Sequence, residues 1–109
     1  MIINPYRTMW LLALFDLPVT TTEKRQEYQK FHKFLKKDGF TMMQYSVYMR
    51  FCPSPENAEA HMGRIKNHVP PEGEVRVIQL TSKQFERMQI YWGRIMKEPE
   101  KPAPQLQFF

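Results

Sequence analysis

MWLLALFDLP, residues 9–18, is the stretch around which the rest of the chain can be arranged. Seven apolar residues run without interruption into Asp16, and Pro18 follows two positions later. A short apolar run bounded by a turn signal is typical of a β-strand that is buried on both faces. We therefore expect a central strand over residues 8–16. Asp16 is then either a turn residue or a reactive carboxylate held rigidly at a strand end.

The length and composition of the chain indicate one folded domain. It has 109 residues, 42% of them hydrophobic, and no apolar run long enough to span a membrane. Residues 1–7 lack a signal-peptide pattern, and the single cysteine, Cys52, excludes an internal disulfide. We therefore expect a protein of the reducing cytoplasm. The net charge of +5 favours a nucleic-acid partner, although a merely basic soluble protein has the same charge.

Turn and capping signals divide the remainder of the chain into alternating strands and helices. Threonines 20–22 start a helix that runs to about Asp38, with Gly39 as its C-cap, and Ser54 with Pro55 starts a second helix. Strands are predicted over residues 40–43, 46–52 and 75–80, helical turns over 81–88 and a short extra strand over 89–92. The order βαββαβ with two helices predicts an α+β, ferredoxin-like domain over residues 1–96 with an antiparallel sheet.

One face of this sheet is predicted to lack a cover within the chain. Both helices lie on the same face of a ferredoxin-like sheet, but the central strand is apolar on both faces. We expect Tyr48 to lie on the uncovered face, because it alternates with Val47 and Met49. A homodimer that packs sheet on sheet would bury this surface.

The last thirteen residues, 97–109, differ in composition from the domain. Three prolines and four charged residues between 97 and 104 predict an extended linker. Leu106 and Phe108 then alternate with glutamines before Phe109, a pattern typical of a strand that adds to another chain's sheet. We expect these three apolar residues to contact a partner, and a disordered tail is the alternative.

Asp16 is the main candidate for chemistry, and it is insufficient alone. Metal-dependent cleavage of a phosphodiester usually needs several oxygen ligands around the metal, and only a two-fold dimer would bring a second Asp16 to the first. The histidines are scattered, Cys52 has no CxxC mate, and no phosphate-binding glycine loop or nucleophile elbow is present.

Basic residues crowd the first predicted helix and are the candidates for nucleic-acid binding. Arg25 precedes Tyr28 by one turn on the apolar stripe, so it either lies along the surface or reaches a phosphate near the strand end. The outer lysines are either simply solvated or contact a nucleic-acid backbone. The candidates are Lys24, Arg25, Lys33, Lys36 and Lys37.

Several of these segments together resemble the CRISPR-associated protein-two family. The resemblance is carried by WLLALFDLP at 10–18, an arginine early in the next helix, Gly39-Phe40, QYSVY at 44–48 and LTSKQFERM at 80–88. The last stretch and the length are most similar to the variety found with type II systems. The similarity covers residues 8–93.

The resemblance implies a cytoplasmic homodimer that takes part in CRISPR spacer acquisition. It implies that the dimer bridges two dimers of the CRISPR-associated protein-one integrase and binds the double-stranded DNA protospacer. Family members have also been assigned endonuclease activity on RNA or DNA, with Mg²⁺ held by the strand-end aspartate, which is Asp16 here. The family's helix arginine corresponds to Arg25. A nuclease that acts on its own and a ribonuclease toxin of similar fold are the alternatives.

Overall fold

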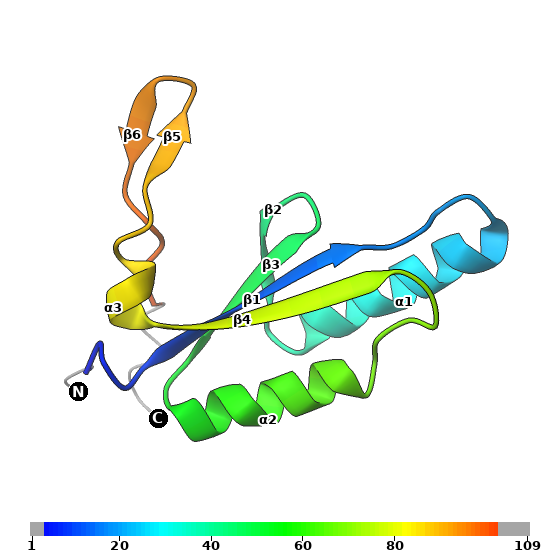
Figure 1. The fold of residues 1–109 in the computed structure, drawn as a ribbon, viewed down its shortest axis with the longest axis horizontal. Coiled ribbons are helices and arrows are strands. Elements are labelled where there is room, and N and C mark those ends of the chain that lie inside the picture. Colours follow the sequence, from blue (N-terminus) through cyan, green and yellow to red (C-terminus); the bar gives the residue numbers. More distant parts are fainter. Residues whose placement is uncertain (1–3, 103–109) are drawn as a thin grey trace.

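The structure is a computed structural model that describes residues 4–102. Its elements follow the predicted order, with one further strand, β6, at the end (Figure 1). They are β1 (Met9–Asp16), α1 (Thr22–Lys37), β2 (Thr41–Gln44), β3 (Val47–Cys52), α2 (Pro55–Lys66), β4 (Glu74–Thr81), α3 (Ser82–Phe85), β5 (Ile90–Trp92) and β6 (Ile95–Lys97).

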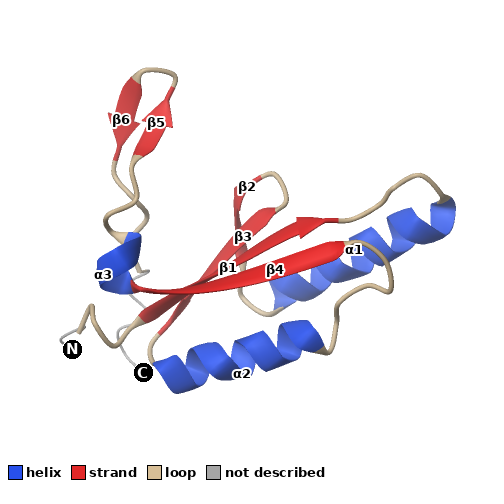
Figure 2. Ribbon diagram, in the orientation of Figure 1, coloured by secondary structure: helices blue, strands red, loops and turns tan. Residues whose placement is uncertain are grey.

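The main sheet has the strand order β2-β3-β1-β4 and is antiparallel throughout. β1 is therefore a central strand, as its apolar run predicts, and β3 and β4 flank it. The helices α1 and α2 lie on one side of the sheet, and in Figure 2 the strands are drawn in front of α1. This arrangement confirms the predicted α+β fold with βαββαβ order.

The core between the sheet and the two helices is mainly aliphatic and aromatic. Leu11 and Ala13 point into it from β1, and Leu35 of α1 and Ile65 of α2 meet them. Each of these four side chains is almost completely buried. Burial of a Leu or Ile side chain is worth about 1.5–3 kcal/mol. This side of the sheet therefore holds the two helices in place.

Tyr48 faces the helices, which corrects the prediction that it lies on the uncovered face. Its side chain is 1% exposed, and its hydroxyl lies 2.7 Å from Nδ1 of His32 on α1. Met49 and Phe51 face the other way and join Trp10 and Leu12. The prediction failed because an alternating strand can be placed on a sheet in two ways, and a one-residue slip exchanges its faces.

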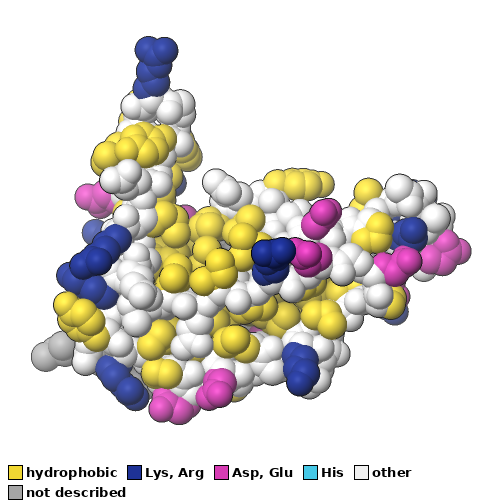
Figure 3. Space-filling view, viewed as in Figure 1, with side chains coloured by type: hydrophobic (Ala, Val, Ile, Leu, Met, Phe, Trp, Pro, Cys, Tyr) yellow, Lys and Arg dark blue, Asp and Glu magenta, His cyan; other side chains and the backbone are white. Residues whose placement is uncertain are grey.

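A second apolar cluster lies on the side of the sheet opposite α1 and α2, which we call the outer face. Trp10 stacks on Phe85 of α3 at a centroid distance of 4.2 Å. Thus α3 covers one end of the outer face, while Ile78 of β4 is 44% exposed. Figure 3 shows hydrophobic side chains gathered over the sheet in this view.

A buried polar cluster joins the end of α1 to α2 and β3. The carboxylate of Asp38 accepts a hydrogen bond from Nδ1 of His61 at 2.7 Å and pairs with Arg64 at 2.9 Å. Its backbone carbonyl accepts a hydrogen bond from Arg50. The C-cap of α1 is Asp38 itself, and Gly39 follows with φ +90°, so the predicted left-handed glycine at the helix end is confirmed one position after the cap.

β5 and β6 form a separate hairpin that stands away from the main sheet (Figure 1). Only its first strand was predicted, and Lys97 belongs to β6 instead of the linker. Tyr91, Trp92, Ile95 and Met96 are all more than half exposed. In the described part of the chain, no helix has both the length and the apolar character needed to cross a bilayer.

Candidate functional site

Asp16 is the last residue of β1, and its side chain is exposed on the outer face. The seven apolar residues before it are fixed by both layers of core, so they hold the carboxylate at a defined place. Its backbone partner on β4 is Glu74, the first residue of that strand. Because directly opposed residues share a face of a sheet, the side chains of Asp16 and Glu74 project from the same face.

Asp16 lies between the start of β4 on one side and the turn between β2 and β3 on the other. Ser46 accepts a hydrogen bond through its carbonyl oxygen from the backbone N–H of Phe15, at 3.0 Å. Its φ of +63° is in the left-handed region, which costs a non-glycine residue about 1–2 kcal/mol. The turn is Tyr45-Ser46, so Ser46 belongs to the turn and is not, as was predicted, the first residue of the strand. Together these segments enclose a shallow depression of about 250 Å³ around Asp16.

Arg76 supplies the positive charge in this depression. Its Nε donates a hydrogen bond to Oε1 of Glu74. This bond and the adjacent charge lower the pKa of Glu74 below its usual value and raise the pKa of Arg76. Neither Glu74 nor Arg76 was predicted as a site residue. The only signal was a Glu-x-Arg spacing at the start of a predicted strand. The register of that strand against β1 is a long-range feature.

The loop before β4 is locked against the backbone of Asp16. Gly73 has φ +95°, and a Cβ at this position would lie 2.7 Å from the carbonyl oxygen of Asp16. Only glycine fits such a close approach without displacing one of the two segments. The placement of Asp16 therefore depends on this loop as well as on the sheet.

The carboxylates of a single chain do not complete a magnesium site. Glu74, which is opposite Asp16 on β4, is already bonded to Arg76. Within residues 4–102, no group of three or more His, Cys, Asp or Glu side chains is placed to hold a metal ion.

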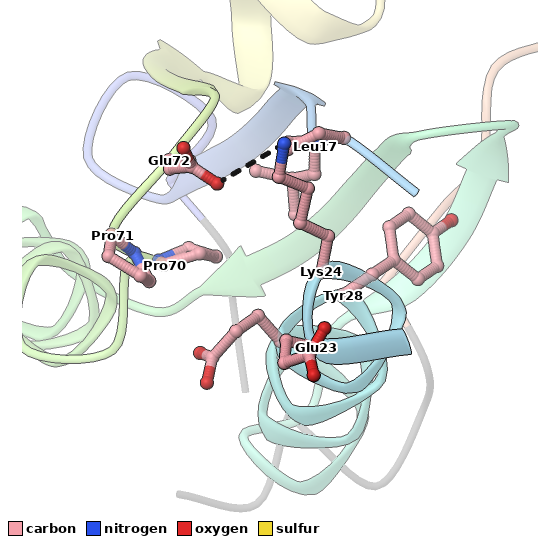
Figure 4. Close-up of a pocket in the computed structure, with 9 residues that line it drawn as sticks. Leu17, Glu23, Lys24, Tyr28, Pro70, Pro71 and Glu72 are labelled. Atoms are coloured by element: carbon pink, nitrogen blue, oxygen red, sulfur yellow. Dashed lines mark ion pairs between the residues drawn. The ribbon is translucent and has the colours of Figure 1, made fainter. Parts of the chain in front are cut away.

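The predicted nucleic-acid-binding residues fall into two groups on α1. Arg25 bonds locally, to the carbonyl oxygen of Val19 at 3.1 Å and to the hydroxyl of Thr22 at 3.3 Å. Lys24 pairs with Glu72 at 3.7 Å, across the pocket shown in Figure 4. The second group is exposed to solvent on α1 and forms no ion pair with other residues of the described region. It consists of Lys33, Lys36 and Lys37.

The pocket in Figure 4 lies between the start of α1 and the loop before β4. Pro70 and Pro71 form one wall and Tyr28 another, around a volume of about 220 Å³. This pocket is on the helix side, away from the outer face that carries Asp16. The predicted partner-binding residues Leu106, Phe108 and Phe109 lie outside the described residues.

Known proteins resemble this chain in both sequence and fold. Residues 9–88 match the family described as CRISPR associated protein Cas2. A CRISPR-associated endoribonuclease Cas2 of Flavobacterium psychrophilum is 46% identical, over 98% of this chain and 93% of that protein. The protein of the same name from Parvibaculum lavamentivorans is 48% identical, over 93% of this chain and all of that protein.

A solved structure supports the same assignment at the level of the fold. A crystal structure of a Cas2 protein superimposes with a TM-score of 0.56 at 18% identity, over 88% of this chain and 98% of that one. The family match includes Asp16, the Tyr45-Ser46 turn, Glu74 and Arg76, which form the depression. The chain therefore belongs to the Cas2 family of CRISPR-associated proteins.

Proposed function

We propose that this chain is a homodimeric subunit of a CRISPR spacer-acquisition complex in the cytoplasm, where it binds duplex DNA and bridges two integrase dimers. The observation that carries this proposal is the outer face, an apolar surface that α1 and α2 leave uncovered and that ends at Asp16. Membership in the Cas2 family supports the role in CRISPR systems. The resemblance of residues 80–88 supports a system of type II.

The outer face and the hairpin both support a dimer. Ile78 exposes 44% of its surface at the centre of β4, next to the cluster around Leu12. The β5–β6 hairpin carries exposed aromatic residues, including Trp92 at 69%. Large exposed apolar surfaces of this kind mark interaction sites in soluble proteins. A second copy on the outer face would cover Ile78 and bring two Asp16 carboxylates near a common axis.

Duplex binding is supported by the basic side of α1. Lys33, Lys36 and Lys37 are exposed and the chain has a net charge of +5. Contacts from lysine to phosphate attract a duplex without reading its sequence and weaken as salt is added. Such binding suits a subunit that fixes the spacing of two integrase dimers on DNA.

A metal-dependent endonuclease at Asp16 is the second candidate function. Its support is the name endoribonuclease that several relatives carry, together with the position of Asp16 beside Arg76. In a dimer, the two Asp16 residues would hold Mg²⁺, which stabilises the charge on a phosphate under attack. The residues of this chain then position the phosphate and the carboxylates around it. We place this activity second to the bridging role.

An insertion assay with Asp16→Asn separates the two functions. We expect the variant to co-purify with the integrase and to support insertion of duplex DNA at the wild-type level. The same variant should lose magnesium-dependent cleavage of RNA or DNA. Glu59→Gln, which removes an equal charge from the exposed side of α2, is the matched control and should change neither.

Two outcomes would contradict the proposal. Loss of insertion in Asp16→Asn, with the complex intact, would make this chain's own chemistry necessary and reject a bridging role. Equal cleavage by wild type and Asp16→Asn would reject the nuclease site. Deletion of residues 105–109 tests the tail. The shortened chain is expected to co-purify less well with the integrase.

A further inference from the structure

Arg76 is placed on the outer face at the rim of the Asp16 depression. Its backbone partner on β1 is Leu14, and the next pair along the same two strands is Phe15 with Val75, followed by Asp16 with Glu74. Side chains two residues apart on a strand share a face, so Arg76, Glu74 and Asp16 lie together. The arginine and Glu74 side chains are 74% and 61% exposed.

Glu74 fixes the direction of the Arg76 guanidinium. The bond runs from Nε, the inner nitrogen of the group, to Oε1 of Glu74 at 2.5 Å. No acceptor is recorded for the two terminal nitrogens among residues 4–102. An arginine held in this way keeps a pair of parallel N–H donors, and this pair matches two oxygens of a phosphate.

A nucleic acid can approach Asp16 only if a positively charged group offsets the acidic side chains there. Asp16 and Glu74 both repel a phosphate, and Arg76 is the sole lysine or arginine among the described residues that line the depression. Its remaining walls are apolar or carry hydroxyl groups, from Leu14, Val47, Tyr45 and Ser46. Arg76 is therefore the one side chain of the depression that attracts an anion.

We propose that Arg76, oriented by Glu74, binds the phosphate of a nucleic acid at the Asp16 site. The inference rests on the proposed nucleic-acid function of that site and adds a residue to it. A purely structural role is the competing explanation, because β4 is an edge strand and charges there discourage unwanted pairing. Exposed ion pairs contribute little to stability, so stability alone does not account for the pair's position beside Asp16.

The test measures binding in a protein that does not cleave. In an Asp16→Asn background, fluorescence anisotropy gives the affinity for a labelled single-stranded RNA and for a DNA duplex over a series of salt concentrations. Arg76→Gln should weaken binding by roughly tenfold, since a good charged hydrogen-bond pair is worth about one factor of ten or more. It should also reduce the salt slope by about one, the value for one phosphate contact.

Two further variants separate a phosphate contact from general charge. Lys66→Gln makes the same charge change at the end of α2, away from the depression, and should leave the affinity within about twofold, as expected of a distant exposed charge. Arg76→Lys keeps the charge but loses the paired donors, so it should restore only part of the affinity. Glu74→Gln leaves the guanidinium less well oriented but also removes a charge that repels phosphate, so it should change the affinity less than Arg76→Gln does.

The outcomes that overturn the proposal are distinct from failure of the nuclease function. Equal effects of Arg76→Gln and Lys66→Gln would reject a specific contact. A change of oligomeric mass in Arg76→Gln, with unchanged affinity, would assign Arg76 to the subunit interface. If the wild-type protein cleaves nothing, the nuclease function fails, and the binding comparison still decides the role of Arg76. Absence of all nucleic-acid binding would overturn both.

Discussion

Gly73 decides where Asp16 sits, and its replacement gives a sharp prediction. Gly73→Ala places a Cβ 2.7 Å from the Asp16 carbonyl oxygen and puts alanine at φ +95°. The left-handed backbone alone costs about 1–2 kcal/mol, so we expect a loss of about 2–3 kcal/mol in the free energy of unfolding, measured by urea titration. Gly63→Ala is the control, since its Cβ meets nothing within 4 Å in α2.

The control should behave in the opposite way. Alanine is favoured over glycine within a helix by about 1 kcal/mol, so Gly63→Ala should stabilise the protein slightly. If both substitutions change the unfolding free energy by the same amount, the loop before β4 is not locked against β1. The depression at Asp16 would then lack the support of this loop.

Cys52 gives a second prediction for a single residue. Its side chain is fully buried, and burial raises the pKa of the thiol to about 11. The thiolate is the reactive form, so it is scarce until the pH approaches 11. We expect a disulfide reagent at pH 8 to label the native protein far more slowly than the protein in urea. Rapid labelling of the native state would contradict the placement of Cys52 in the core.

The start of α1 supplies a prediction at the level of an element. Three consecutive threonines lie at the helix start: Thr20 and Thr21 precede the helix, and Thr22 is its first residue. The hydroxyl of Thr21 accepts the hydrogen bond from the Lys24 N–H. Loss of a cap costs about 1 kcal/mol, so Thr21→Ala should lower the free energy of unfolding by that amount. Thr20→Ala should change it little. A larger effect of Thr20→Ala in the same urea titrations would mean that Thr20, and not Thr21, caps the helix.

The same elements show which features the sequence reveals. β1, the Ser54-Pro55 helix start and the left-handed Gly39 after α1 depend on local chemistry, so they were predicted correctly. The facing of Tyr48 depends on register, which one residue reverses. β6 was missed because its turn, Gly93-Arg94, lacks the usual Asn-Gly or Asp-Gly signal.

The residues of the site divide in the same way, into those visible from local sequence and those that depend on strand register. Asp16 was predicted because one charge ends an apolar run, which is visible locally. Glu74 and Arg76 come to it only through the pairing of β1 with β4, across almost sixty residues of chain. No local pattern encodes that register, so Asp16 could be predicted as one side of the depression, whereas Glu74 and Arg76 on the other side could not.

At the scale of the whole molecule, the outer face predicts a dimer that one charge should break. Ile78→Glu places a carboxylate among apolar residues if a second copy packs there, and an unpaired buried charge is strongly unfavourable. We expect wild type at twice the chain mass of 13.2 kDa and the variant shifted toward the single-chain mass, measured by sedimentation equilibrium. Circular dichroism should show that the variant stays folded, since Ile78 is 44% exposed in one chain.

Val69→Glu is the matched control for this substitution. Val69 is 47% exposed, close to the value for Ile78, but it follows α2 and lies outside the sheet. The same carboxylate at this position should leave the mass of the dimer unchanged. Equal dissociation by both variants would mean that added charge, and not its position, controls assembly. A wild-type protein that stays monomeric at every concentration would remove the common axis that is needed to bring two Asp16 residues together.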